Sequence, residues 1–397
     1  MVTAQQTSAG PTMQHEPPGK ARTWFDVTAV VVLKAILLLV ALNIVLYLFS
    51  LLKPPAAEPD PLSRYGGDAL QQAYPGWRPQ DVRELIQETS HRHVAWEAFT
   101  GFKERAFRGK YVNVDAAGFR YSKDQAPWPP DPQRTNVFVF GGSTTFGYGL
   151  PDDETIASYL SDCVPTRSSR RLAVYNFGRE GYLSTQELIL FQQLIKAGFV
   201  PQVAVFIDGI NDFFLADGQP SFADGMRRFM DGQVSSSNPL DRLPMIKAWH
   251  KLRNWLTPRA RPQPQKQAWD EADPKLLEGV VNRWLVNKKL TEASAAAFGV
   301  RSIFVWQPVP GYKYDLRYHF LSAGGQLGHY PPTLSGYALV DNLQAQGKLG
   351  PDVLWLGDMQ QDRHENLYVD AVHYNAKFSR DIAGEICRFI NEHATGQ

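Results

Sequence analysis

The sequence predicts an α/β protein in which a parallel sheet lies between two layers of helices, preceded by one membrane-spanning helix. The first observation is an apolar run at residues 27–52. The second is the alternation of short β-branched and aromatic segments with helical patterns from residue 136 onward, which is typical of parallel strands joined by right-handed crossovers. The third is a glycine-rich turn at Gly141-Gly142-Ser143, directly after the first of these strands. Such turns lie at the sheet edge where open α/β proteins bind ligands.

The amino-terminal region divides by composition into a tail and a span. Residues 1–26 are mostly polar and predict a disordered cytoplasmic tail. Residues 27–52 are long enough, at about 1.5 Å per residue, to cross a bilayer. A cleaved signal peptide is the alternative, but no clear A-x-A cleavage site follows. Basic residues precede the span more than they follow it, so the positive-inside rule predicts a single-pass inner (cytoplasmic) membrane protein whose remainder is periplasmic or extracellular.

Residues 53–135 predict an extracytoplasmic spacer and a lead-in to the main domain. The spacer begins rich in proline, alanine and glycine. A short amphipathic helix is expected at residues 81–90. The aromatic residues spread through 94–125 indicate that this part packs on the core.

Composition excludes several classes of protein. The 41 Lys and Arg residues balance 40 Asp and Glu residues, which argues against general nucleic-acid binding. Only Cys163 and Cys387 are present, so neither a disulfide-rich scaffold nor a cysteine-based zinc cluster is possible. Two buried free thiols are the favoured expectation, and a disulfide is the alternative if this part is exported. We expect no metal and no cofactor.

The repeating core is expected at residues 136–397. Five buried strands are predicted, at 137–140, 172–176, 203–207, 301–306 and 353–356. Helices are expected after Asp152, after Ser184-Thr185 as a cap, at 273–298 and at 378–390. Two insertions interrupt the pattern, at about 213–267 and 308–349. The first is polar and expected to be mobile in part, and the second is dense in tyrosine and glycine.

The first strand runs into a turn that holds Ser143. This turn lacks the Gly-Lys-Ser/Thr of a P-loop and the spacing of a dinucleotide fingerprint. It also lacks the second glycine of the G-x-S-x-G elbow, since Thr145 occupies that position. Taken alone, Ser143 is more typical of a turn or helix-cap residue than of a nucleophile.

Polar residues follow other strands of the same predicted sheet. Gly181 follows the second strand, Asn211 follows the third, and Asp370 and His373 follow the fifth. Each is unremarkable alone, because Asn and Asp are common turn residues and Asp370 and His373 also fit a helix cap beside a surface histidine or half of a metal site. Because the carboxyl ends of parallel strands share one edge, we expect these groups to lie near Ser143.

Four blocks that contain Ser143, Gly181, Asn211 and Asp370-Ala-Val-His373, in this order, resemble those of the SGNH, or GDSL-like, hydrolase superfamily. The resemblance covers residues from about 136 to the carboxyl terminus. It implies a flavodoxin-like three-layer α/β/α sandwich and a serine esterase or acyltransferase. By the same resemblance, the oxyanion donors are the backbone N–H groups of Ser143 and Gly181 and the side-chain amide of Asn211.

The chemistry of each role is independent of the family. A serine hydroxyl is a poor nucleophile until a base takes its proton, and His373 is the candidate base. Its ring must be held in one tautomer, and Asp370 is close enough in sequence to do so. Backbone or amide N–H donors then stabilise the oxyanion, each by about 3 kcal/mol. We therefore predict that Ser143, Asp370 and His373 are the catalytic residues.

Two departures from the family pattern matter. Gly142 stands where the family has aspartate before the serine, which leaves the positioning of Ser143 open. The second block offers Gly178 as well as Gly181, and we select Gly181 because family spacing places the oxyanion glycine just before the segment that starts at Tyr182.

The location and the resemblance together predict an ester substrate of the cell envelope, either a glycan or a lipid, with polysaccharide O-acetyl groups as the first choice. An O-acyltransferase with the same triad and a noncatalytic glycan-binding envelope module are the alternatives. A lipase or thioesterase would need an acyl channel. Tyr312 and Tyr314 form either a sugar-stacking wall or a structural aromatic cluster.

Overall fold

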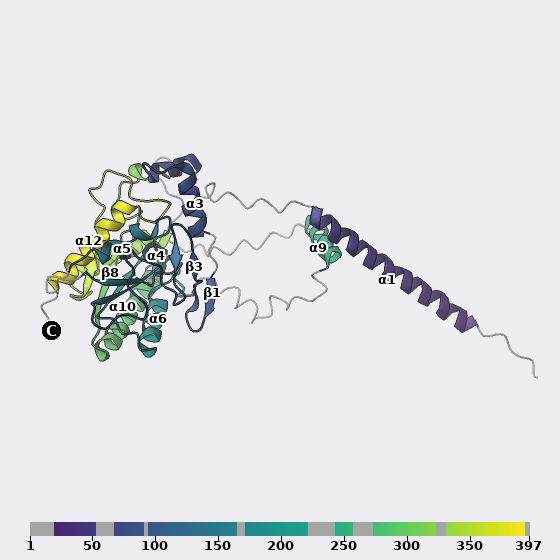
Figure 1. Cartoon of the computed structure of the whole chain (residues 1–397), viewed down its shortest axis with the longest axis horizontal. Coiled ribbons are helices and arrows are strands. Elements are labelled where there is room, and N and C mark those ends of the chain that lie inside the picture. The colour runs from purple at the N-terminus through teal and green to yellow at the C-terminus, as the bar shows by residue number, and fades with distance from the viewer. Residues whose placement is uncertain are drawn as a thin grey trace, which may run out of the picture. The chain divides into compact units, whose positions relative to one another are not determined.

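The computed structural model describes residues 20–52, 67–90, 94–164, 171–220, 243–256, 273–322 and 331–393. These residues form two compact units (Figure 1). One unit contains helix α1 (Lys20–Leu52) and helix α9 (Pro244–Leu256), and the other contains every remaining described element. The predictions for residues 1–19, for the start of the spacer and for most of the first insertion lie outside the described residues.

All five predicted strands are present in one parallel sheet. They are β5 (Asn136–Gly141), β6 (Ala173–Asn176), β7 (Val203–Asp208), β8 (Arg301–Trp306) and β9 (Val353–Trp355). Their order is β6-β5-β7-β8-β9, which in chain order is the 2-1-3-4-5 arrangement of a flavodoxin-like sheet. The predicted α/β fold class is therefore confirmed. Strands β5 and β7 are neighbours in the sheet, and their pairing extends to Gly141 and Ile207 at the carboxyl end of β5.

Helices cover both faces of this sheet. Alternate residues of β5 point to opposite faces, so Val137 and Val139 belong to one hydrophobic core and Phe138 and Phe140 to the other. The valine side packs against α5 (Ile156–Ser161) and α12 (Ala376–Glu392). The phenylalanine side packs against α6 (Ser184–Lys196) and α10 (Pro274–Ala297). Every residue of β5 is buried, which explains why its sequence is an unbroken apolar run.

Side chains cap two of the long helices, whereas the one cap that the sequence predicted is absent. Asp273 caps α10 through Lys275 N, and Asn375 caps α12 through Phe378 N. The expected Ser184-Thr185 cap of α6 is wrong, because Leu183 is the N-cap and makes no side-chain cap bond. The Ser184 hydroxyl instead donates to Asp212 Oδ1 at 2.6 Å, a partner from a distant segment.

The lead-in packs on the core, as its aromatic content indicates. It contains η1 (Gly67–Ala73), α3 (Pro79–Ser90) and the short strands β1 (Val94–Glu97), β2 (Gly101–Glu104), β3 (Phe107–Arg108) and β4 (Asn113–Val114). From this region, the fully buried Arg120 donates to the carbonyl oxygens of Phe146, Gly147 and Leu150. The lead-in therefore holds the loop that follows Ser143.

Both insertions contain helices that the sequence analysis did not predict. The first contains α9, and the second contains η4 (Leu316–Tyr318) and α11 (Pro331–Ala345). Helix α11 packs against α10 and against α7 (Ile210–Phe214). Its Tyr337 is fully buried, and the hydroxyl of that residue donates to Gln307 O at 2.8 Å. The second insertion is thus part of the core.

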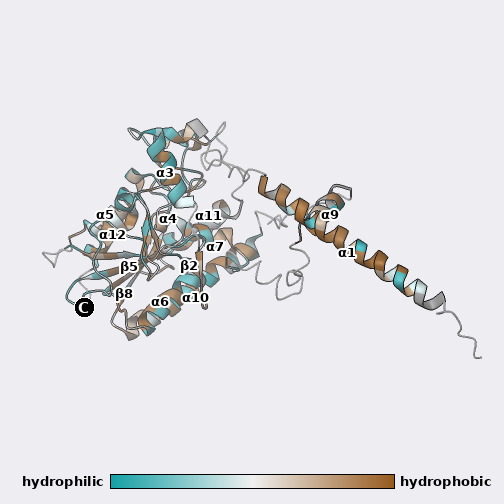
Figure 2. Ribbon diagram, turned by 45° about the vertical axis from the view of Figure 1, so that its right-hand side comes forward, coloured by the Kyte–Doolittle hydropathy of each residue, from teal (hydrophilic) through white to brown (hydrophobic). Residues whose placement is uncertain are grey.

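Helix α1 has the length and composition to cross a membrane. Its segment Thr23–Phe49 is strongly apolar and none of it is buried by protein. Figure 2 shows hydrophobic residues along most of the helix. The side chains of Thr28 and Asn43 bond to carbonyl oxygens four residues earlier, which satisfies polar groups inside this segment.

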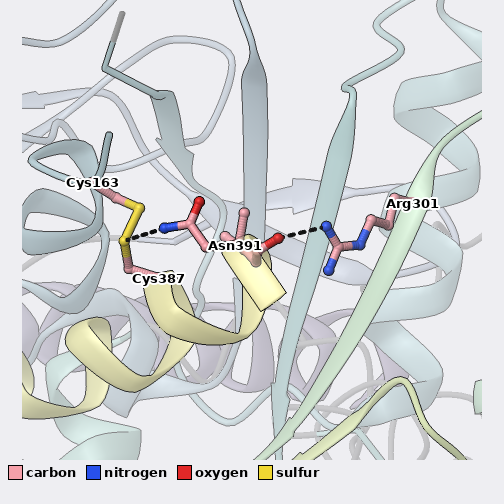
Figure 3. Close-up of a disulfide and its surroundings, with 5 residues drawn as sticks. Cys163, Arg301, Cys387 and Asn391 are labelled. Carbon is pink, nitrogen blue, oxygen red and sulfur yellow. Dashed lines mark hydrogen bonds between the residues drawn. A yellow bond between two sulfur atoms is a disulfide. The ribbon is translucent and has the colours of Figure 1, made fainter. Parts of the chain in front are cut away.

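The two cysteines form a disulfide, against the favoured expectation of two free thiols. Cys163 follows α5 and Cys387 lies in α12, with their Cα atoms 5.8 Å apart (Figure 3). Asn391 Nδ2 donates to Cys387 Sγ at 3.7 Å. The pairing arises because α5 and α12 are neighbours on one face of the sheet. A separation of 224 residues hides this proximity from the sequence.

Candidate active site

The site is built at the carboxyl edge of the sheet, where β5 turns into α4 (Ser143–Phe146). Gly142 is the N-cap of this short helix, and Gly147 ends it in the left-handed conformation at φ 87°. Ser143 is half-buried, whereas the three residues after it are buried. The sharp turn thus leaves the serine as the accessible residue of α4.

His373 is within hydrogen-bond reach of the serine. Its Nε2 lies 2.8 Å from Ser143 Oγ, and its Nδ1 lies 2.6 Å from Asp370 Oδ2. The ring of Tyr148 stacks on the imidazole with centroids 5.0 Å apart. Ser143, His373 and Asp370, which the sequence placed at strand ends, therefore meet in one line of hydrogen bonds.

Asp370 is buried and held by the backbone. Its Oδ1 accepts the N–H groups of Val372 at 2.9 Å and of His373 at 2.8 Å. Burial by itself raises the pKa of Asp370, but His373 and these two N–H groups together outweigh burial and hold the pKa below the ordinary 3.8. An ionised Asp370 accepts a hydrogen bond from the Nδ1–H group of His373, so Nε2 faces Ser143 as an acceptor.

Asn211 and Gly181 border the same serine. Asn211 Nδ2 donates to Tyr182 O at 2.6 Å, next to Gly181, which has φ 66°. A Cβ atom on Gly142 would lie only 2.2 Å from Asn211 Nδ2. Asn211 therefore lies against Gly142, the residue before Ser143, and its amide is bonded to the residue after Gly181.

Gly178, the alternative to Gly181, has a structural role. Its N–H donates to Asn176 Oδ1 at 3.0 Å, and a Cβ there would lie 2.4 Å from Phe146 N. Gly178 therefore packs against the back of α4, and its N–H is used within the turn. This arrangement favours Gly181 as the oxyanion glycine.

Gly142 has a physical reason to differ from the family aspartate. A Cβ at position 142 would lie 2.2 Å from Asn211 Nδ2, the end of a side chain, so any other residue there requires Asn211 to move. An aspartate at 142 would therefore displace the Asn211 amide from its present position, and glycine allows this close approach.

Gln307, which no sequence pattern identified, links the Ser143 segment to the His373 segment. Its Oε1 accepts the Thr144 hydroxyl at 2.6 Å and lies 3.0 Å from the Tyr374 hydroxyl. Thr144 follows Ser143 directly, and Tyr374 follows His373. One buried amide oxygen thus contacts the neighbours of both reacting residues.

Replacing Gln307 by leucine is expected to lower kcat by about tenfold or more. The change removes the acceptor of the Thr144 hydroxyl, at a net cost of about 1 kcal/mol. The Tyr374 hydroxyl keeps Pro308 O as an acceptor at 2.6 Å, but the contact that Gln307 shares between the two segments is lost. Thr144→Val, which removes only one of the two donors, is the matched variant and should have a smaller effect. Steady-state kinetics separate kcat from KM. An unchanged kcat in a folded Gln307→Leu protein would contradict this positioning role.

A cluster of three interacting buried carboxyl groups lies close to the segment that carries Asn211. Asp208 ends β7 and accepts Trp284 Nε1 at 2.9 Å, Asp212 lies in α7, and Glu187 lies in α6. Burial and then mutual repulsion raise the pKa of Asp208 to about 8, and the pKa of Glu187 is raised for the same reasons. The folded protein therefore holds protons here that the unfolded chain releases near pH 4.

Stability is expected to fall as pH rises between about 4 and about 8, because the folded state binds more protons than the unfolded state in that window. Asp208→Asn keeps an acceptor for Trp284 without a charge. It should flatten this decline by about 1–2 kcal/mol at the alkaline end. Urea unfolding of the purified chain at several pH values measures the slope. Glu278→Gln, at an exposed position on α10, is the control and should keep the wild-type slope. A wild-type slope in Asp208→Asn would contradict the assignment.

Tyr312 and Tyr314 belong to structural clusters. Tyr312 packs on Tyr337 and Trp355, and its hydroxyl donates to Asp341 at 2.7 Å. Tyr314 is buried, and its hydroxyl donates to Glu365 O at 2.8 Å. Of the two predictions for these tyrosines, a sugar-stacking wall or a structural aromatic cluster, the structural cluster describes both residues.

The fold and these distances define an α/β protein with a serine–histidine–aspartate triad at the carboxyl edge of its sheet. No protein-family model matches the chain, and no curated protein matches it. The chain is similar to solved structures of a lipolytic G-D-S-L family member from Veillonella parvula (10% identity, 64% of this chain and 96% of that one, TM-score 0.35) and of the esterase EstA from a Pseudoalteromonas species (14%, 66% and 100%, 0.33). It is also similar to a catalytic mutant of an acetylxylan esterase from Geobacillus stearothermophilus (11%, 64% and 94%, 0.36).

Proposed function

We propose that this chain is a serine esterase of the SGNH type that works through an acyl-enzyme. The observation that carries the proposal is the continuous line from Ser143 Oγ to His373 Nε2 at 2.8 Å and from His373 Nδ1 to Asp370 Oδ2 at 2.6 Å. A noncatalytic module would have no need to hold these three groups in this order.

In the first half-reaction, His373 takes the Ser143 proton as Oγ attacks the ester carbonyl carbon. The carbonyl oxygen becomes an oxyanion, which the N–H groups of Ser143 and Gly181 and the Asn211 amide stabilise. His373 then gives its proton to the departing alkoxide, and the acyl group stays on Ser143. Water attacks this ester with His373 again as base, which releases the acid and restores the serine.

The substrate that we propose is an ester of the cell envelope, with O-acetyl groups on a glycan as the first candidate. Two features support an extracytoplasmic location: the apolar helix α1 and the Cys163–Cys387 disulfide, since structural disulfides persist in oxidising compartments. A transferase would use the same acyl-enzyme and pass the acyl group to a sugar hydroxyl.

A covalent probe tests this function directly. The full chain should react with a fluorophosphonate and gain one adduct, mapped by mass spectrometry to Ser143, while losing its p-nitrophenyl acetate hydrolysis. Ser294→Ala, which changes a hydroxyl on α10 that bonds Gln192, should be labelled normally. An adduct at another serine, or hydrolysis that continues after complete labelling of Ser143, would refute the proposal. Acyl transfer to an added oligosaccharide in place of hydrolysis would assign a transferase.

A further inference from the structure

Helix α9 contacts the apolar helix α1 through its first turn. The backbone N–H of Met245 donates to Asn43 Oδ1 at 3.1 Å, and Asn43 Nδ2 donates to Leu39 O at 2.9 Å. The amides of a helix first turn have no partner within their own helix, and an asparagine inside an apolar span also needs partners. Each group therefore satisfies the other. Figure 1 shows α9 beside one end of α1.

Asn43 lies near the carboxyl end of the apolar segment Thr23–Phe49. If that segment spans a bilayer, Asn43 lies toward one face of the hydrocarbon layer and not at its centre. At a rise of 1.5 Å per residue, Asn43 is about 10 Å from the middle of the segment, so the first turn of α9 lies about 5 Å inside the edge of a hydrocarbon layer about 30 Å thick.

An apolar stripe begins in the first turn of α9 at the partly exposed Met245 and is uncovered farther along the helix. Met245, Trp249 and Leu252 follow one another at helical spacing, and the last two are 59% and 46% exposed. Lys247 projects from a different face and is exposed. No Asp or Glu occurs between Pro244 and Leu256. A basic helix with tryptophan and leucine on its apolar side is typical of helices that lie in the membrane interface.

We propose that α9 lies in the headgroup region of an anionic bilayer beside α1, with Trp249 and Leu252 in the acyl boundary. The occupant of the stripe is lipid, because the stripe continues from a helix whose own surface is apolar and uncovered. The inference rests on the proposed membrane anchoring. It gives the chain a second membrane contact within the insertion that follows α7, the helix that carries Asn211.

Depth-dependent quenching tests this placement in the full chain. The native cysteines are paired with each other, so one introduced thiol is a unique labelling site. Leu252→Cys, Lys247→Cys and Leu37→Cys are each labelled with an environment-sensitive nitrobenzoxadiazole dye and reconstituted into vesicles of phosphatidylcholine and phosphatidylglycerol. Trp249→Cys repeats the test at a second site on the stripe. Hydrolysis of p-nitrophenyl acetate by each variant reports separately on the proposed esterase.

The dye at Leu252→Cys should be quenched at least twofold by lipids with a shallow doxyl group, and the dye at Lys247→Cys much less. The dye at Leu37→Cys, in the middle of α1, should be quenched by a deep doxyl group. Quenching at Leu37→Cys without quenching at Leu252→Cys or Trp249→Cys would overturn the inference and leave the anchor intact. A blue-shifted but unquenched dye on the stripe would place protein there and also overturn it. No quenching at Leu37→Cys would overturn the anchor and the inference together, whereas loss of hydrolysis alone would affect only the esterase proposal.

Discussion

Replacing Ser143 by alanine is expected to lower ester hydrolysis by about a thousandfold or more. The substitution removes the atom that forms the acyl-enzyme, and His373, Asp370 and Asn211 cannot replace it. The residual rate should be that of water attack assisted by the oxyanion donors. The kcat/KM of the purified chain for p-nitrophenyl acetate, compared with wild type, measures the effect.

A loss of activity is informative only if Ser143→Ala remains folded. Ser143 is half-buried, and among the described residues its Oγ is bonded only to His373, so the free energy of unfolding should change by less than about 1 kcal/mol. His373→Ala should reduce the rate similarly, and the double variant should be little worse than either single one, because triad residues act as a unit. Activity within tenfold of wild type in folded Ser143→Ala would refute the assignment of the nucleophile.

The sheet was predictable because its strands are buried on both faces. A strand such as β5, with Val and Phe facing two different cores, has an unbroken apolar sequence that few other structures produce. The positions of Ser143, Asn211 and His373 followed from the same fact, since parallel strands deliver their carboxyl ends to one edge. Strand patterns therefore predicted that these groups share one sheet edge, and the resemblance to the SGNH superfamily selected them among the polar residues there.

The contacts that hold the site were not predictable, because they join segments far apart in sequence. Gln307 follows β8 as an ordinary polar residue, and only the folded chain brings its amide between Thr144 and Tyr374. Gly142 presents the same problem. Its glycine has a reason only once Asn211, from a different strand end, approaches its Cα. Side-chain identity at such positions depends on tertiary neighbours that no local pattern records.

Removal of the disulfide is the second large effect that we expect. The bond between Cys163 and Cys387 closes a loop across most of the α/β domain, with 224 residues of separation. Chain-entropy arguments give a loop of this length about 5 kcal/mol of stabilisation, which is a large part of the stability of a typical domain. The double variant Cys163→Ala, Cys387→Ala should lose about this free energy of unfolding in urea, together with a lower Tm.

A reduced wild-type chain is the matched control for this variant. If the loss comes from the cross-link, dithiothreitol should lower the stability of wild type by a similar amount and leave the double variant unchanged. If packing of the sulfur atoms between α5 and α12 were the cause, reduction alone would have little effect, and that result would contradict the prediction. Neither cysteine contacts Ser143, His373 or Asp370 among the described contacts, so kcat of the folded double variant should stay close to wild type at low temperature. A stability that depends on the cross-link, with chemistry that does not, is what we expect of a catalytic domain that folds in an oxidising compartment.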